Sequence, residues 1–160
     1  MHRIVNPILA AVLLAAATIP LPSAGTFETE MLIEHNVIRG EVRVPPLRWS
    51  ARLAIAARKW ADTLAANGRF EHQTHNPYGE NLFTAAGTEA PPIEVVRWWA
   101  AEASDYDYKT NTCRGTCGHY TQLVWRNTRE VGCAEARGQG RQVVVCEYDP
   151  PGNWRGERPW

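Results

Sequence analysis

The spacing of apolar residues predicts helices in the first two thirds of the chain. Residues 27–38 carry apolar side chains at helical intervals, and Gly40 with the prolines that follow it ends this segment. A further helix is expected to begin at Pro91 or Pro92 and to run to about Ser104, because proline is favoured in the first turn of a helix.

A second helix is predicted between these two. Ser50 is its expected N-cap, and Asn67-Gly68 is expected to stop it. Its apolar residues fall at positions i, i+4, i+7 and i+11, which is one face of a helix. That core-facing stripe consists of Leu53, Ala57, Trp60 and Leu64.

The last third of the chain favours strands. Residues 117–125 are rich in aromatic and β-branched side chains, and we interpret them as an apolar strand with His119 at its mouth. Thr121 and Gln122 would then lie on opposite faces of that strand. Buried polar groups need partners, so we expect either a sheet covered on both sides or a strand that lines a cleft.

A hairpin is predicted downstream. Residues 131–134 and 143–148 are strand-like and flank Gly138-Gln139-Gly140, a turn sequence. Residues 79–83 are expected to form a short additional strand. Helices thus precede a terminal set of strands, which predicts an α+β domain with helices covering a small antiparallel sheet.

The N-terminal segment has the pattern of a signal peptide. Met1-His2-Arg3 is positively charged, residues 8–19 are apolar, and Ser23-Ala24 supplies the small residues of a cleavage site. We therefore expect residues 1–24 to be removed and residues 25–160 to form one secreted domain. The same signal would also suit delivery to a periplasm or a cell wall.

Charge argues against two classes of partner. The chain has 17 basic and 17 acidic residues, so removal of Arg3 with the signal peptide leaves 16 and 17. A nearly neutral domain has no electrostatic footprint for nucleic acid or for an anionic membrane. No apolar run in residues 25–160 approaches the length of a membrane span.

Four cysteines lie in the last third of the chain, and an exported protein is expected to use them in disulfides. Three pairings are possible. The hairpin would set Cys133 opposite Cys146, within reach of a disulfide. Cys113 and Cys117 would then close a small loop ahead of the predicted strand.

Several polar residues are candidates for chemistry. Residues 69–81 form a polar loop that contains His72 and Glu80. Glu102 falls near the C-terminus of the third predicted helix, where the helix dipole disfavours a carboxylate, so a functional reason for its presence is sought. Taken alone, His72 and His119 are compatible with structural roles, and no HExxH, GxSxG or P-loop motif is present.

Several motifs together resemble a known family. The chain is similar to the secreted CAP superfamily of cysteine-rich secretory, antigen-5 and pathogenesis-related-1 proteins, over essentially all of residues 25–160. The motifs that carry the resemblance are Phe70-Glu71-His72, Gly79-Glu80-Asn81-Leu82, Trp99 with Glu102, Gly118-His119-Tyr120-Thr121-Gln122-Leu123-Val124-Trp125, Val131-Gly132-Cys133-Ala134 and Cys146-Glu147-Tyr148-Asp149-Pro150-Pro151-Gly152-Asn153.

This resemblance implies an α-β-α sandwich and a cleft lined by His72, Glu80, Glu102 and His119. Imidazoles are good ligands for zinc and similar divalent metals, and carboxylates either ligate directly or orient other ligands. Two histidines leave coordination positions open, so weak, pH-dependent binding is expected. The alternative, compatible with metal binding, is a hydrogen-bonded network that braces loop, helix and strand.

The resemblance also implies function. The first hypothesis is a secreted module that binds a sterol, another lipid or a protein partner, with a role in defence or against microbes. The second is a zinc-dependent hydrolase or protease in which His72 and His119 hold the ion and Glu80 or Glu102 is the general base. The third is a non-catalytic structural or interaction protein.

The chain departs from the pattern of plant members. It lacks a cysteine in residues 67–70 and has Gly138 where a cysteine often occurs, which leaves Cys113 and Cys117 to pair with each other. Glu147 replaces a more usual asparagine, and Trp160 replaces a terminal tyrosine.

Overall fold

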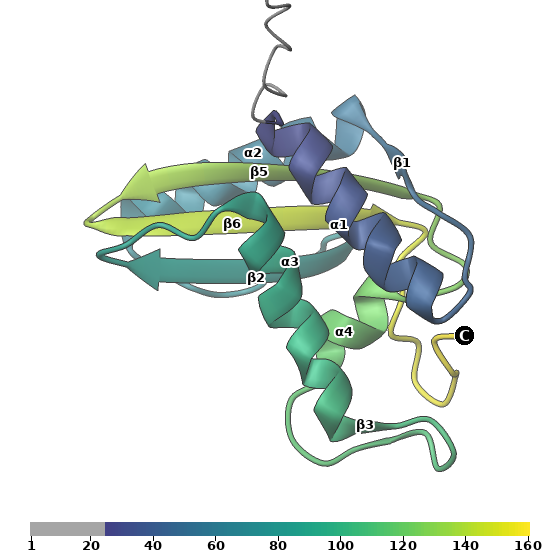
Figure 1. The fold of residues 1–160 in the computed structure, drawn as a ribbon. Helices are drawn as coiled ribbons and strands as arrows, with labels where there is room; N and C mark the ends of the chain where they lie inside the picture. Colours follow the sequence, from purple (N-terminus) through teal and green to yellow (C-terminus); the bar gives the residue numbers. More distant parts are fainter. Residues whose placement is uncertain (1–24) are drawn as a thin grey trace, which may run out of the picture.

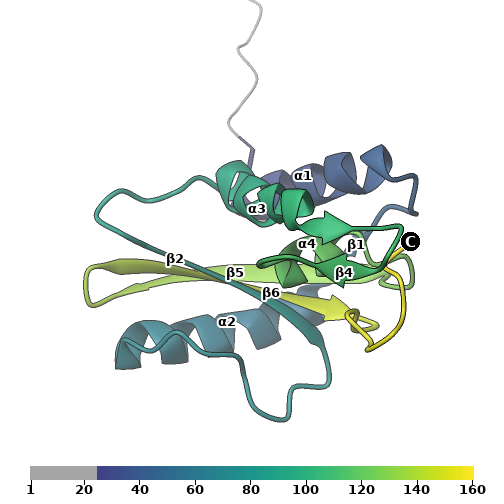
Figure 2. The same ribbon diagram turned by 90° about the horizontal axis from the view of Figure 1, so that it is seen from below.

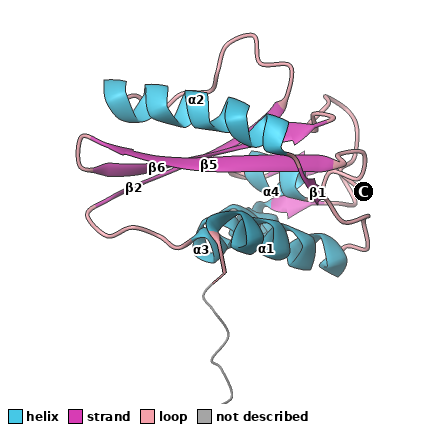
Figure 3. Cartoon of the chain, turned by 90° about the horizontal axis from the view of Figure 1, so that it is seen from above, coloured by secondary structure: helices cyan, strands magenta, loops and turns pink. Residues whose placement is uncertain are grey.

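The computed structural model describes residues 25–160, so the expected signal peptide lies outside the described residues. Helices cover both faces of one sheet: α2 lies on one side, and α1, α3 and α4 lie on the other (Figure 3). The elements in chain order are α1 (Phe27–Glu41), β1 (Arg48–Trp49), α2 (Ala51–Asn67), β2 (Gly79–Ala86), α3 (Pro92–Ala101), the 3-10 helix η1 (Glu102–Asp105), β3 (Tyr106–Asp107), β4 (Thr112–Cys113), α4 (Gly118–Leu123), β5 (Glu130–Gly138) and β6 (Arg141–Asp149).

The main sheet has the strand order β1-β5-β6-β2 (Figure 1). Strands β5 and β6 form the predicted hairpin, and β2 pairs antiparallel with β6. The expected antiparallel sheet is mixed at one edge, because two-residue β1 runs parallel to β5. Backbone bonds from Arg48 N–H to the Arg129 carbonyl and from Ser50 N–H to the Val131 carbonyl hold it there. Strands β3 and β4 form a separate ribbon near the C-terminus (Figure 2).

Strand alternation gives the sheet two apolar faces. On one face, Val143 and Val145 pack with the predicted stripe of α2, where Ala57 and Leu64 are buried. On the other face, alternate β6 residues Val144, Cys146 and Tyr148 pack with α1 and α3. This parity decides on which side of the sheet each polar residue of β2 and β6 lies.

The predicted strand at residues 117–125 is wrong, because Gly118–Leu123 forms the short helix α4. The amide of Thr121 donates to the Cys117 carbonyl, a helical i→i−4 bond. Residues 120–123 are all buried, and Gln122 bonds to Thr128 Oγ1 and to the Gly152 amide. A helix whose last four residues are all buried needs no amphipathic pattern, so tertiary packing accommodates its β-favouring residues.

Arg39 fixes the chain that follows α4. Its guanidinium is fully buried and donates to four backbone carbonyls, those of Pro45, Leu123, Trp125 and Thr128. Burial, followed by the neighbouring charge of Arg129, lowers the pKa of Arg39 to about 10. The positive charge is therefore held by carbonyl dipoles that join α1 to the segment after α4.

Two disulfides join the pairs expected from the sequence. The hairpin disulfide links Cys133 to Cys146, which are cross-strand partners in β5 and β6. The loop disulfide links Cys113 to Cys117 just before α4. The C-terminal tail is anchored by Trp160, whose ring lies 4.8 Å from that of Tyr108, centroid to centroid.

Candidate functional site

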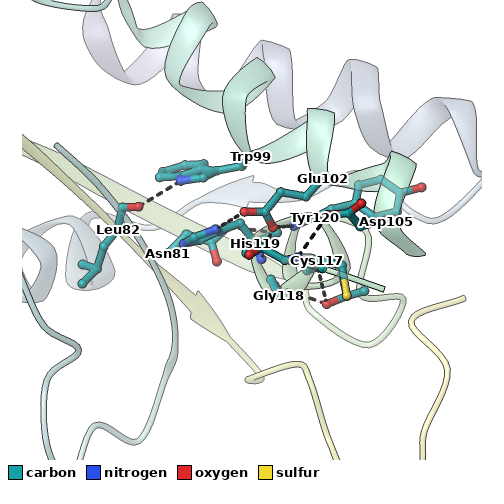
Figure 4. A network of polar contacts seen from close by, with 12 residues as sticks. Asn81, Leu82, Trp99, Glu102, Asp105, Cys117, Gly118, His119 and Tyr120 are labelled. Carbon is teal, nitrogen blue, oxygen red and sulfur yellow. Dashed lines mark hydrogen bonds and ion pairs between the residues drawn. The ribbon is translucent and has the colours of Figure 1, made fainter. Parts of the chain in front are cut away.

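Glu102 and His119 form the first of two histidine–carboxylate pairs. Glu102 follows the last turn of α3, and His119 lies in the first turn of α4. Nδ1 of His119 is 2.6 Å from Glu102 Oε1 (Figure 4). A carboxylate oxygen accepts, so Nδ1 carries the proton and the opposite ring nitrogen, Nε2, keeps its lone pair when the ring is neutral.

The same carboxylate caps helix α4. Glu102 Oε2 accepts from the backbone amides of His119, at 2.9 Å, and Tyr120, at 3.4 Å. Cys117, the N-cap residue, makes no side-chain capping bond. A negative charge is favourable at the start of a helix. A carboxylate is unfavourable at the C-terminus of α3, but the same carboxylate is favourable at the N-terminus of α4. Its contact with α4 therefore explains why Glu102 lies at the end of α3.

Trp99 holds the face of the His119 ring. The two rings are stacked with centroids 6.1 Å apart and planes 21° apart. The indole Nε1 donates to the Leu82 carbonyl at 3.0 Å, so the tryptophan is itself fixed to β2 (Figure 4). Glu102 at one edge and Trp99 on one face thus orient His119, whose side chain is 27% exposed.

His72 and Glu80 form the second pair. Nδ1 of His72 lies 2.5 Å from Glu80 Oε1, which also accepts from the Gln73 amide at 3.2 Å. The His72 side chain is 64% exposed, whereas that of Glu80 is only 5% exposed. The hydrogen bond to Glu80 raises the pKa of His72, and partial burial opposes that rise.

A hydrogen-bonded chain connects the His119 backbone to the core. Asn81 Nδ2 donates to the His119 carbonyl, at 3.1 Å, and to the Tyr148 hydroxyl, at 3.2 Å. Tyr148 lies 2.9 Å from His35 Nε2, and His35 Nδ1 lies 2.7 Å from the Met31 carbonyl. A carbonyl only accepts, so Nδ1 of His35 donates and its Nε2 accepts from Tyr148. Tyr148 and Asn81 thus link the buried His35 to the site, and only their contacts in the folded chain reveal this connection.

Among the described residues, no side-chain hydrogen bond joins one pair to the other. Glu80 and Leu82 occupy alternate positions of β2 on the α2 side, whereas Asn81 reaches Tyr148 on the other side. Among residues 25–160, the group of three potential ligand side chains whose donor atoms lie within 4.8 Å of one another is His35, Cys133 and Cys146.

Those three residues do not suit a metal, because both sulfurs are committed to the hairpin disulfide and both His35 nitrogens to hydrogen bonds. The chemistry of the two histidine–carboxylate pairs fits a metal better. Carboxylates fix both rings through Nδ1, and no described residue hydrogen-bonds to Nε2 of His72 or His119.

Comparison with known proteins agrees with this fold and these motifs. The sequence profile of the cysteine-rich secretory protein family, CAP, matches residues 32–148, and the chain belongs to that family. It is 39% identical over 154 residues to pathogenesis-related protein 1 of Arabidopsis thaliana, covering 96% of this chain and 94% of that protein. It is 43% identical over 136 residues to pathogenesis-related protein 1A of Nicotiana tabacum, covering 83% and 80% respectively.

A solved structure agrees with the sandwich architecture. NaASP2, described as a crystal structure with Zn²⁺, matches with a TM-score of 0.70 at 21% identity, covering 88% of each chain. At that identity the likeness supports the fold alone. The α-β-α sandwich expected from the sequence is therefore confirmed.

Proposed function

We propose that this protein is a secreted, non-catalytic binding module whose His72 and His119 rings bind a divalent metal of the zinc class through Nε2. The observation that carries this proposal is the matched orientation of the two rings, each held at Nδ1 by a buried or half-buried carboxylate. Such carboxylate–histidine pairs fix the tautomer that presents Nε2 to a metal and raise its basicity.

In this proposal Glu80 and Glu102 orient the ligands. Zinc sites normally use three or four protein ligands, so two histidines on separate supports give weak binding with open positions. A bound ion would supply Lewis acidity and positive charge. No described hydroxyl or thiol hydrogen-bonds to Nε2 of either ring, which favours binding over nucleophilic catalysis by these histidines.

Zinc titration of purified residues 25–160 by calorimetry tests this proposal. We expect His72→Gln and His119→Gln each to weaken zinc binding at least tenfold, because each removes one nitrogen ligand. His75→Asn is the matched control, since it removes an exposed imidazole from the same loop. Equal zinc affinity in all four proteins would contradict the proposal. Zinc-dependent cleavage of a peptide and ester panel that His119→Gln abolishes would instead support the hydrolase hypothesis.

The partner we propose is a sterol or another lipid. Helices α1 and α3 lie together on one face of the sheet (Figure 1). Both helices carry exposed apolar side chains. Ile33 and Val37 are 55% and 50% exposed on α1, and Trp98 is 66% exposed on α3. Exposed apolar surface of this kind is typical of interaction sites.

Binding of labelled sterol and fatty acid tests the lipid proposal. We expect saturable binding that Trp98→Ala weakens and that Trp154→Ala, which removes another exposed tryptophan far along the chain, leaves unchanged. No saturable binding of either lipid would refute it.

Secretion is tested by sequencing the N-terminus of exported protein, and two disulfides are consistent with an oxidising compartment. Among residues 25–160, no helix is both long and apolar enough to cross a membrane.

A further inference from the structure

A second acidic residue lies directly beside Glu80. Glu80 of β2 and Glu147 of β6 are cross-strand partners, so their side chains leave the sheet on the same face. Glu147 alternates with Cys146 and Tyr148 and shares the α2 side with Val143 and Val145. The Glu80 side chain is 5% exposed and Glu147 is fully buried, so two carboxyl groups meet in a water-poor environment.

Hydrogen-bond donors reach only one oxygen of each carboxyl group. Glu80 Oε1 accepts from His72 Nδ1 and from the Gln73 amide. Glu147 Oε2 accepts from Asn76 Nδ2 at 2.8 Å. The remaining oxygens, Glu80 Oε2 and Glu147 Oε1, are buried and are the buried side-chain polar atoms without a hydrogen-bond partner among the described residues.

Two unpartnered buried carboxylate oxygens are energetically unfavourable unless something positive lies between them. Burial raises the pKa of Glu147 to about 8; the Asn76 bond opposes the rise, and the charge of Glu80 and a hydrogen bond between the two carboxyl groups add to it. No described Lys or Arg side chain forms an ion pair with either group. Above that pKa the site has acceptor capacity and negative charge that the described side chains do not satisfy.

We propose that Glu80 Oε2 and Glu147 Oε1 bind a divalent cation of the hard, oxygen-preferring class, such as Mn²⁺ or Ca²⁺. Carboxylate oxygens are the ligands these ions prefer, whereas the His72 and His119 nitrogens suit zinc-class ions. The new site rests on the proposed function only in sharing Glu80, which orients His72 with one oxygen and offers the other to this cation. Its donor atoms are different and lie on the α2 side of the sheet.

The experiment measures Mn²⁺ binding to residues 25–160 at pH 8, close to the pKa of Glu147, so that a large share of this group is ionised. The readout is the electron paramagnetic resonance signal of free Mn²⁺. Thermal unfolding with Mn²⁺ or Ca²⁺ is a second readout. We expect one bound Mn²⁺ and a raised Tm in the wild type. Glu147→Gln keeps the shape of the side chain and should weaken Mn²⁺ binding at least tenfold and abolish the Tm shift. Glu80→Gln should do the same.

Glu135→Gln is the matched control, because it neutralises a glutamate on β5 that faces neither oxygen. Two results would overturn the inference: equal Mn²⁺ binding in the wild type and Glu147→Gln, or no Mn²⁺ binding by the wild type at millimolar Mn²⁺. Either result would leave a shared proton as the bridge between the two carboxyl groups. The outcome is separable from zinc binding: His119→Gln tests the proposed zinc role and should leave Mn²⁺ binding intact.

Discussion

His35 should make this protein sensitive to acid. Its ring is fully buried between α1 and β6, with Nδ1 donating to the Met31 carbonyl and Nε2 accepting from Tyr148. Protonation would place a second N–H against the tyrosine hydroxyl and a charge in the core. Burial lowers the pKa of His35 to about 4; the nearby Arg39 charge adds to that effect, and the Met31 bond opposes it.

The magnitude follows from linkage. The ordinary pKa of 6.5 applies in the unfolded chain, and the folded value is about 4. A depressed folded pKa contributes stability that is fully present above pH 6.5 and is lost as the pH falls towards 4, because the unfolded state takes up the proton first. At 1.36 kcal/mol per pKa unit, the shift corresponds to about 3 kcal/mol, a large part of the stability of a small domain.

Urea unfolding at several pH values between 4 and 7.5 provides the assay. His35→Gln removes the titrating group, so it should be less stable than the wild type at pH 7, and that difference should shrink by about 3 kcal/mol at pH 4. The control His75→Asn should follow the wild-type curve, since His75 is exposed. Parallel curves for wild type and His35→Gln across this range would refute the reasoning, as would an NMR titration that gives His35 a pKa near 6.5.

Three further predictions concern the stability of the fold. A Cβ on Gly132 would overlap backbone atoms of α2, so Gly132→Ala should lower the unfolding free energy by about 1–3 kcal/mol. Gly40 lies in α1, and a Cβ there would meet nothing within 4 Å, so Gly40→Ala should raise the unfolding free energy by about 0.5–1 kcal/mol. Thermal melts that show equal effects of the two substitutions would contradict this. Arg39→Lys should cost about 2–4 kcal/mol in urea unfolding, because an ammonium cannot reach four carbonyls, and a cost below 1 kcal/mol would speak against their importance. Replacing both cysteines of the hairpin disulfide by alanine should lower the unfolding free energy by about 3 kcal/mol, and the same change in the loop disulfide by about 2 kcal/mol, because the closed loops span 13 and 4 residues in sequence. Urea denaturation of the two double variants tests this, and a larger loss for the loop disulfide would contradict it.

Local patterns were sufficient to predict the long elements. The stripe of α2 and the turn between β5 and β6 each follow from periodicity or turn chemistry over a few residues. Of the α2 stripe, Leu53, Ala57 and Leu64 are buried, while Trp60 is half-buried and donates to the Glu71 carbonyl.

The same patterns failed at α4. Its β-favouring residues indicate a strand, and its helical state depends on burial by α3, by the tail and by the cap from Glu102, none of which is local. Elements distant in sequence place the four expected site residues in two histidine–carboxylate pairs. Motif matching alone cannot show which histidine pairs with which glutamate. Glu147 was noted as a substitution, but only the β2–β6 register reveals its neighbour Glu80.

The double use of Glu102 has an evolutionary consequence. One carboxylate holds the His119 ring and also caps the helix that carries it. Any substitution there that released the His119 ring would also loosen α4, so selection for a folded protein acts on the same atoms that orient this histidine. A lineage under selection for folding alone would therefore retain this glutamate, and with it a His119 ring held in a single tautomer.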